Sequence, residues 1–119
     1  WDIIATGGLL KSGTMSLFGK KAADSINSYN ADKAFFSCKG IDLEKGATDR
    51  NDDSVVVKQS ILSSAGKIYL AADSTKFGKV AFSKICSLSK VDVVVTDKKP
   101  DAEWMKTFKE LGIECIYAE

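Results

Sequence analysis

Short apolar runs alternate with amphipathic stretches along the chain, and this alternation predicts that strands alternate with helices. The apolar runs lack regular polar positions, which is typical of strands that are buried on both faces of a sheet. One further extended stretch, Val80–Ile85, has a weaker pattern. The predicted strands are Ile3–Thr6, Ala34–Phe36, Lys67–Ala72, Val91–Val95 and Ile113–Ala118.

Three intervening stretches carry apolar residues at helical spacing. They are Leu17–Tyr29, a stretch from Asp52 or Asp53 to about Ala65, and a stretch from Pro100 and Asp101 to Leu111. An Asp side chain can cap the second helix, and Gly66 is expected to end it. Gly112 is expected to end the third helix in the same way.

Two polar segments, Leu9–Ser16 and Glu44–Asp53, contain glycine and are predicted to be loops. Outside them, strand and helix patterns follow one another along the chain. The predicted fold class is therefore α/β, with a mostly parallel sheet that has helices on both faces.

The composition fits one globular domain. The chain has 119 residues, of which 45% are hydrophobic, and 17 basic against 16 acidic residues give a net charge of +1. This balance argues against nucleic-acid binding as the main activity, because phosphate binding needs a clustered excess of Lys and Arg. No apolar run approaches the roughly 20 residues that cross a membrane, and no signal segment opens the chain. We therefore expect a cytoplasmic location without membrane contact.

The chain has no histidine. This absence excludes catalysis by Ser-His-Asp or Cys-His groups and zinc sites that use histidine. We predict no cofactor and no metal site. The three cysteines, Cys38, Cys86 and Cys115, are widely spaced and form no C-x-x-C pair, so we expect reduced thiols.

A short polar motif follows each of four predicted strands. If these strands are parallel, all four motifs lie at the carboxyl edge of the sheet, where open α/β folds bind their ligands. The motifs are Thr6-Gly7-Gly8, Gly40-Ile41-Asp42, Asp73-Ser74-Thr75-Lys76 and Thr96-Asp97.

The residue types in these motifs suit a small polyol that carries an anionic group, of which phosphate is the commonest. Gly7 and Gly8 let a ligand approach backbone N–H groups closely. Lys76 supplies a cation, and the three Asp residues of the motifs can accept hydrogen bonds from sugar hydroxyls. Each motif also has a simpler interpretation, because Thr-Gly-Gly is a common turn and Asp-Ser can cap a turn.

The segment Asp73–Gly78 and its surroundings resemble the C-terminal sensor domain of DeoR-type bacterial transcriptional repressors. The resemblance covers essentially the whole chain, and the matching segments occur in the order that the family has. They are Thr6-Gly7-Gly8, Ser16-Leu17-Phe18-Gly19, Ala31–Phe36, Gly40-Ile41-Asp42, Gly46-Ala47-Thr48, Lys58, Asp73–Gly78, Val91–Asp97 and Leu111–Glu114.

This resemblance implies a ribose-5-phosphate-isomerase-like α/β fold that binds a phosphorylated sugar or related metabolite. Residues 1–119 would form one sensor domain that assembles with copies of itself. The family's opening strand and helix have no counterpart in the chain, so the fold is expected to be incomplete at its N-terminal side. Operator DNA would be bound by a separate N-terminal winged helix-turn-helix, which is absent from this chain.

The resemblance and the polar motifs together define a predicted effector site. The residues implied by the resemblance are Gly7, Gly8, Gly40, Asp42, Gly46, Lys58 and Lys76, and the motifs add Thr6, Asp73 and Asp97.

Two alternatives to a sensor domain stay open. The first is a sugar-phosphate isomerase on the same fold, in which Asp42 would act as the base and Lys76 would stabilise the enediolate. Ser54-Val55 replaces the Glu-Ala pair that the family commonly has on the helix carrying Lys58, and this difference favours sensing over catalysis. The second alternative is an oligomerisation domain with a degenerate pocket.

Overall fold

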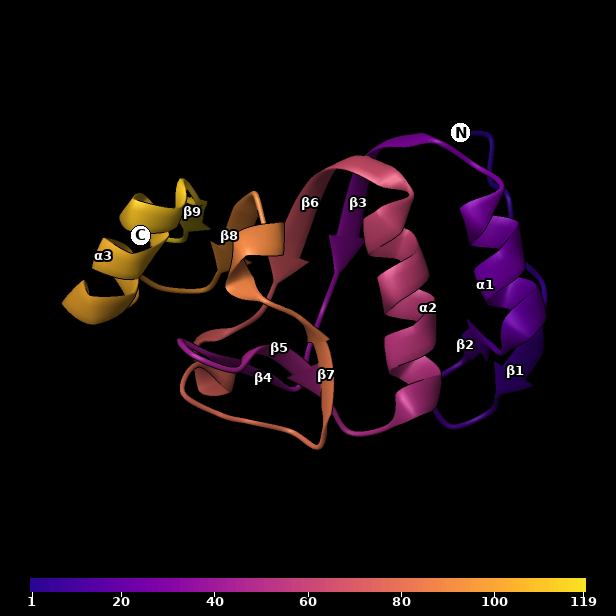
Figure 1. The fold of residues 1–119 in the computed structure, drawn as a ribbon, viewed down its shortest axis with the longest axis horizontal. Helices are drawn as coiled ribbons and strands as arrows, with labels where there is room; N and C mark the ends of the chain where they lie inside the picture. The colour runs from indigo at the N-terminus through magenta and orange to yellow at the C-terminus, as the bar shows by residue number, and fades with distance from the viewer.

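A four-stranded parallel sheet forms the centre of the structure (Figure 1). The computed structural model describes residues 1–119. Phe36 pairs with Leu70, and Leu70 pairs with Val94, so equivalent positions of neighbouring strands share one face. The strand order is β3-β6-β8-β9, with β3 at Ala31–Phe36, β6 at Ala65–Ala71, β8 at Val93–Thr96 and β9 at Glu114–Tyr117. The predicted α/β class with a parallel sheet is confirmed.

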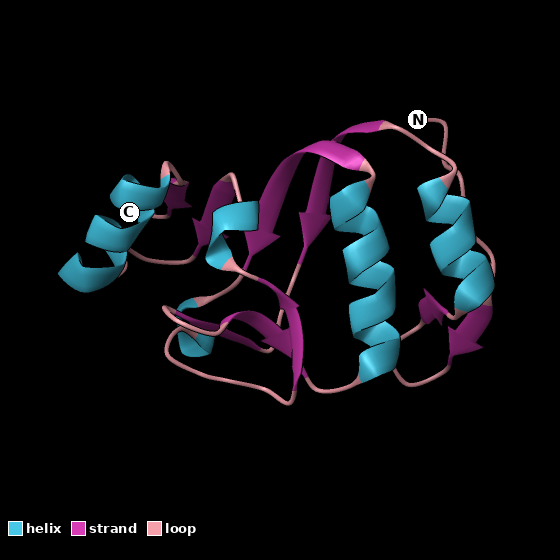
Figure 2. Ribbon diagram, in the orientation of Figure 1, coloured by secondary structure: helices cyan, strands magenta, loops and turns pink.

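Three α-helices connect the strands: α1 at Lys20–Asn27, α2 at Asp52–Ser63 and α3 at Ala102–Leu111 (Figure 2). The cap of α2 is Asn51, whose side chain accepts a hydrogen bond from the Ser54 N–H at 3.1 Å. Asp52 and Asp53 lie in the first turn, so the prediction that one of them is the cap was wrong by one or two residues. The predicted stop of α2 at Gly66 was also wrong, because α2 ends before Ser64 and Gly66 already lies in β6. Gly112 does end α3, in the left-handed conformation.

A second, antiparallel sheet lies beside the first. Its strands are β4 at Gly40–Asp42, β5 at Gly46–Asp49 and β7 at Ser83–Cys86, in the order β4-β5-β7. The predicted loop at Glu44–Asp53 was therefore wrong in its centre, where β5 is fully buried. The polar residues of β5 are typical of a loop, but Thr48 and Asp49 are buried and form hydrogen bonds with Ala81 and Lys58 of other segments. The weak extended pattern over Val80–Ile85 corresponds to β7, shifted toward the C-terminus.

The N-terminal segment differs most from the prediction. Ile3–Thr6 is not a strand, because no neighbouring strand pairs with it, and Ile3 and Ile4 are 85% and 69% exposed. The segment predicted as a loop, Leu9–Ser16, instead contributes to a hairpin of β1 at Leu9–Lys11 and β2 at Ser16–Phe18.

The main core covers one face of the parallel sheet. There Leu70 and Val94 belong to the same buried cluster as Val55 of α2 and Phe108 of α3. The sequence predicts helices on both faces, but α2 and α3 both pack on this one. On the opposite face Phe35 is 63% exposed and Ile116 is 46% exposed. Phe35 there stacks on Tyr69 with 4.6 Å between ring centroids.

All three cysteines are free thiols, as predicted. Cys38 and Cys86 are buried, and burial is the main reason why the pKa of each is raised to about 11. Both thiols therefore stay protonated near neutral pH and pack as small apolar side chains.

We expect Gly46→Ala to lower the free energy of unfolding more than Gly112→Ala. Both glycines are left-handed, with φ of 75° and 72°, so each substitution strains the backbone by about 1–2 kcal/mol. A Cβ at Gly46 would lie 2.2 Å from the Cys86 carbonyl oxygen, whereas one at Gly112 would meet nothing within 4 Å. The clash adds about 1–3 kcal/mol, measurable by urea unfolding. Equal losses in the two variants would contradict a tight contact between β5 and β7.

Candidate functional site

The carboxyl ends of β6 and β8 are joined by a hydrogen-bonded clamp. The Ser74 N–H donates to Asp97 Oδ1 at 2.6 Å, and the Ser74 hydroxyl donates to Asp97 Oδ2 at 3.1 Å. Asp73 accepts hydrogen bonds from the backbone N–H and the hydroxyl of Thr75, and it thereby caps the 3₁₀ turn η1 at Ser74–Lys76. Parallel pairing thus brings the two predicted motifs together at one edge (Figure 1).

These hydrogen bonds also hold both carboxylates ionised. The side-chain and backbone hydrogen bonds from Thr75 lower the pKa of Asp73. The backbone hydrogen bond from Ser74 lowers the pKa of Asp97. Both carboxylates therefore stabilise the turn at the carboxyl edge of the sheet, as in the simpler interpretation of the Asp-Ser motif.

The motif Gly40-Ile41-Asp42 forms β4 and has two structural roles. Gly40 lies against the backbone of Lys79, because a Cβ there would be 2.3 Å from the Lys79 carbonyl oxygen. The Asp42 carboxylate closes the turn after β4 by accepting the N–H groups of Glu44 at 3.0 Å and Lys45 at 2.8 Å.

A buried ion pair lies beyond the carboxyl end of β3. Lys58 Nζ, on α2, is 2.5 Å from Asp49 Oδ2 and donates to the Ser37 carbonyl oxygen at 2.7 Å. The side chains of Lys58 and Asp49 are 20% and 5% exposed. Burial by itself raises the pKa of Asp49, but the hydrogen bonds from Lys58 and the Arg50 N–H outweigh it and lower the pKa. Two of the three donor positions of Lys58 Nζ are therefore already occupied within the protein.

A basic cleft opens beside this ion pair. Its cavity of about 440 Å³ is lined by four cations and three apolar residues: Lys39, Arg50, Lys76 and Lys79, with Val80, Ala81 and Phe82. Lys76 is the one predicted site residue among the four cations. Lys39 directly precedes the Gly40 motif and Lys79 directly follows Gly78, so motifs extended by one residue would have included both. No sequence signal indicates Arg50.

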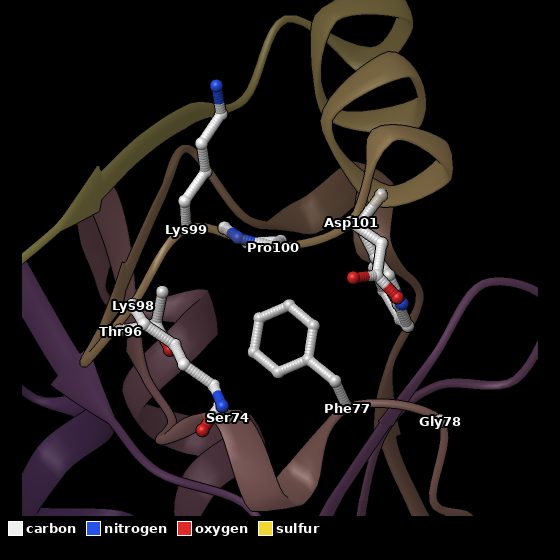
Figure 3. Close-up of a pocket in the computed structure, with 9 residues that line it drawn as sticks. Ser74, Phe77, Gly78, Thr96, Lys98, Lys99, Pro100 and Asp101 are labelled. Atoms are coloured by element: carbon white, nitrogen blue, oxygen red, sulfur yellow. The ribbon is translucent and has the colours of Figure 1, made fainter.

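A second cavity of about 390 Å³ lies on another side of η1. Figure 3 shows the ring of Phe77 between Thr96 and Lys98 on one side and Asp101 on the other. The ring packs edge-on against Trp104 with 4.8 Å between centroids. The lining residues are Ser74, Phe77, Gly78, Thr96, Lys98, Lys99, Pro100, Asp101 and Trp104.

The remaining predicted residues lie elsewhere. Thr6 lines an apolar groove between the N-terminal segment, α1 and β3. Gly7 is exposed, and Gly8 packs against β2, where a Cβ would be 2.6 Å from the Phe18 carbonyl oxygen. Gly46 is buried against β7. The structure therefore places Lys76, but not the Thr6-Gly7-Gly8 motif, in the basic cleft.

No group of three or more acidic or cysteine side chains is arranged to hold a metal ion. None of the helices has the length and apolar character needed to span a membrane.

Comparison with known proteins gives consistent matches. The family model described as "DeoR C terminal sensor domain" matches residues 1–98. The HTH-type transcriptional regulator YulB of Bacillus subtilis (strain 168) is 34% identical over 95% of this chain and 44% of its own length. The putative aga operon transcriptional repressor of Escherichia coli O157:H7 is 28% identical over 97% of this chain and 43% of its own length. The deoxyribose operon repressor of Escherichia coli (strain K12) is 36% identical over 77% of this chain and 36% of its own length. The chain thus spans less than half the length of these relatives.

We expect Lys58→Met to lower the free energy of unfolding by about 3–5 kcal/mol near neutral pH, because it leaves the buried Asp49 carboxylate without a counter-ion. The loss should shrink near pH ~4, because protonation of Asp49 then removes the buried charge from the variant. In the native protein the pKa of Asp49 is below its unfolded value of about 3.9. The contribution of the pair is therefore complete above that value and disappears as the pH falls through the folded-state pKa.

Urea unfolding at the two pH values measures both effects. Lys106→Met is the control, because Lys106 lies 3.9 Å from Glu110 in an exposed pair that contributes about 0–1 kcal/mol. A loss for Lys58→Met that is as small as the control, or that is the same at both pH values, would contradict a buried ion pair.

Proposed function

The chain belongs to the family of DeoR C-terminal sensor domains, and from this membership we propose that it senses a phosphorylated sugar or related metabolite for a transcriptional repressor. Two of the relatives are operon repressors by name. Ligand binding in this domain would change the affinity of the whole protein for its operator, which is a coupling between two sites.

The observation that carries this proposal is the position of Lys76 in the basic cleft. Lys76 follows β6 at the carboxyl edge, where α/β folds bind ligands, and it shares one cavity with three other cations. A phosphate group is a ligand that such a cavity recognises, because Lys supplies point charges and Arg supplies a planar fork of donors.

The carboxylates of the edge favour sensing over catalysis. An isomerase needs a carboxylate that is free to remove a proton from the substrate. Asp42 accepts two backbone N–H groups, and Asp73 and Asp97 hold η1 in place. We therefore rank a sugar-phosphate isomerase below a sensor domain. The concentration of cations in one cavity likewise favours a sensor over a pure oligomerisation domain.

We further propose how the domain acts within a longer protein. Its net charge of +1 gives it no general affinity for DNA, so operator binding would belong to a separate N-terminal helix-turn-helix segment. The relatives are transcriptional regulators more than twice as long as the matched segment, which supports this division. The domain would act in the cytoplasm as part of a homo-oligomer, without membrane contact.

We expect a thermal-shift screen of sugar phosphates, free sugars and inorganic phosphate to find a phosphorylated compound that stabilises the protein. A ligand at about 100 times its Kd adds roughly 2.7 kcal/mol to the free energy of unfolding. Lys76→Gln should weaken binding of that compound more than tenfold, or about 1.4 kcal/mol, because it removes a cation from the cleft. Lys109→Gln, an exposed lysine on α3, should leave the affinity unchanged. A ligand that binds both variants equally would place the effector outside the basic cleft.

A further inference from the structure

None of the four cations of the basic cleft takes part in an ion pair within the protein. The structure contains three ion pairs, Lys20–Asp24, Lys58–Asp49 and Lys106–Glu110, and none of them includes Lys39, Arg50, Lys76 or Lys79. No acidic residue lines the cavity. Asp49, which precedes Arg50 in the chain, is already paired with Lys58. The carboxylates nearest to Lys39 and Lys76 in the chain, Asp42 and Asp73, accept backbone N–H groups of their own turns. Four positive charges therefore face one cavity, and its walls concentrate their field.

The backbone that carries these cations is held together by one buried residue, Thr48. The Lys39 N–H donates to the Thr48 carbonyl oxygen at 2.9 Å, and the Ala81 N–H donates to Thr48 Oγ1 at 2.8 Å. Thr48 is only 2% exposed, and Arg50 lies two residues beyond it in the chain. A single side chain and its carbonyl group thus connect the segments that bear Lys39, Arg50 and Lys79.

The segment with Lys76 is attached to the same framework. The Gly78 N–H donates to the Ile41 carbonyl oxygen at 2.8 Å, and Gly40 packs against the Lys79 carbonyl oxygen. The backbone positions of the four cationic residues are therefore fixed relative to one another before any ligand binds. A site arranged in this way loses less entropy on binding than a set of independent surface lysines.

The charge of the cleft indicates the class of ligand. One phosphate ester carries about −1.5 to −2 charges near pH 7, and it would balance only about half of the cations. Two such groups would balance all four. The volume of about 440 Å³ lies within the range of small-molecule sites. Phe82, which is 90% exposed, and Val80 line the same cavity and offer apolar surface to a carbon skeleton.

We propose that the basic cleft binds a small metabolite with two anionic groups on one carbon skeleton, either two phosphates or a phosphate and a carboxylate. This inference rests on the proposed function, because it specifies the ligand of the same sensor site. It assigns Lys39, Arg50 and Lys79 to ligand binding together with Lys76.

Calorimetry of the chain with five probes tests the ligand class. The probes are fructose 1,6-bisphosphate, 6-phosphogluconate, fructose 1-phosphate, fructose 6-phosphate and inorganic phosphate. We expect at least one of the two doubly anionic probes to bind ten times more tightly than every monophosphate. Equal affinities for doubly and singly anionic probes would overturn this inference and leave the proposed function intact. Absence of binding by all five probes would overturn both.

A double substitution tests the assigned residues. Lys39→Gln with Lys79→Gln should reduce the preference for the doubly anionic probe from tenfold to less than threefold. Both side chains are exposed, and the N–H groups of Lys39 and Ala81 that donate to Thr48 are retained. Lys98→Gln with Lys99→Gln is the matched control, because it removes the same charge from the cavity on another side of η1. A preference that survives the first pair, or that falls equally in the control, would contradict the assignment.

Discussion

Parallel hydrogen bonding between β3, β6 and β8 is the constraint on which the rest of the structure depends. Because the three strands run in the same direction, the segments that follow them emerge at one edge. The Asp97 carboxylate can then reach the Ser74 N–H at 2.6 Å, although the two residues belong to different connections. That clamp fixes η1, and η1 carries Lys76 into the basic cleft. The position of the candidate site is thus a consequence of strand direction.

Acidic and basic residues at this edge differ in whether they have partners within the chain. Asp42, Asp73 and Asp97 accept backbone N–H groups, so their charges stabilise turns and are satisfied within the chain. The cations of the cleft have no such partner, because a lysine or arginine side chain has no acceptor and needs an oxygen from elsewhere. Lys58 differs from these cations, since its ammonium group donates to the Asp49 carboxylate and to the Ser37 carbonyl oxygen. At this edge, therefore, these three carboxylates are engaged within the chain, and the cations of the cleft remain available to an anion.

The sequence predicts the parallel sheet well, because continuous apolar runs such as Val91–Val95 have few alternatives in a small α/β fold. It fails at β5, where Thr48 and Asp49 are polar and yet buried, since their partners come from distant segments. It fails in the opposite way at Ile3–Thr6, which has a strand pattern but no strand beside it. The motif Asp73–Lys76 predicts Lys76 as a site residue, whereas Arg50 becomes a candidate only because the antiparallel sheet brings it into the cleft.

The overall charge of the chain and the local charge of the site lead to different conclusions. A net charge of +1 excludes a surface that attracts nucleic acid over its whole length. It says nothing about one cavity, because the acids that balance the total lie elsewhere or are engaged in turns. The hydrogen bonds of Thr48 join the Lys39 and Ala81 segments, which both line this cavity. No acidic side chain lines the cavity, so the cations are separated from the acids that balance the total charge. Folding therefore gathers four cations around one cavity in a chain that is almost neutral overall, and such a cavity suits the anionic ligand that we propose for this domain.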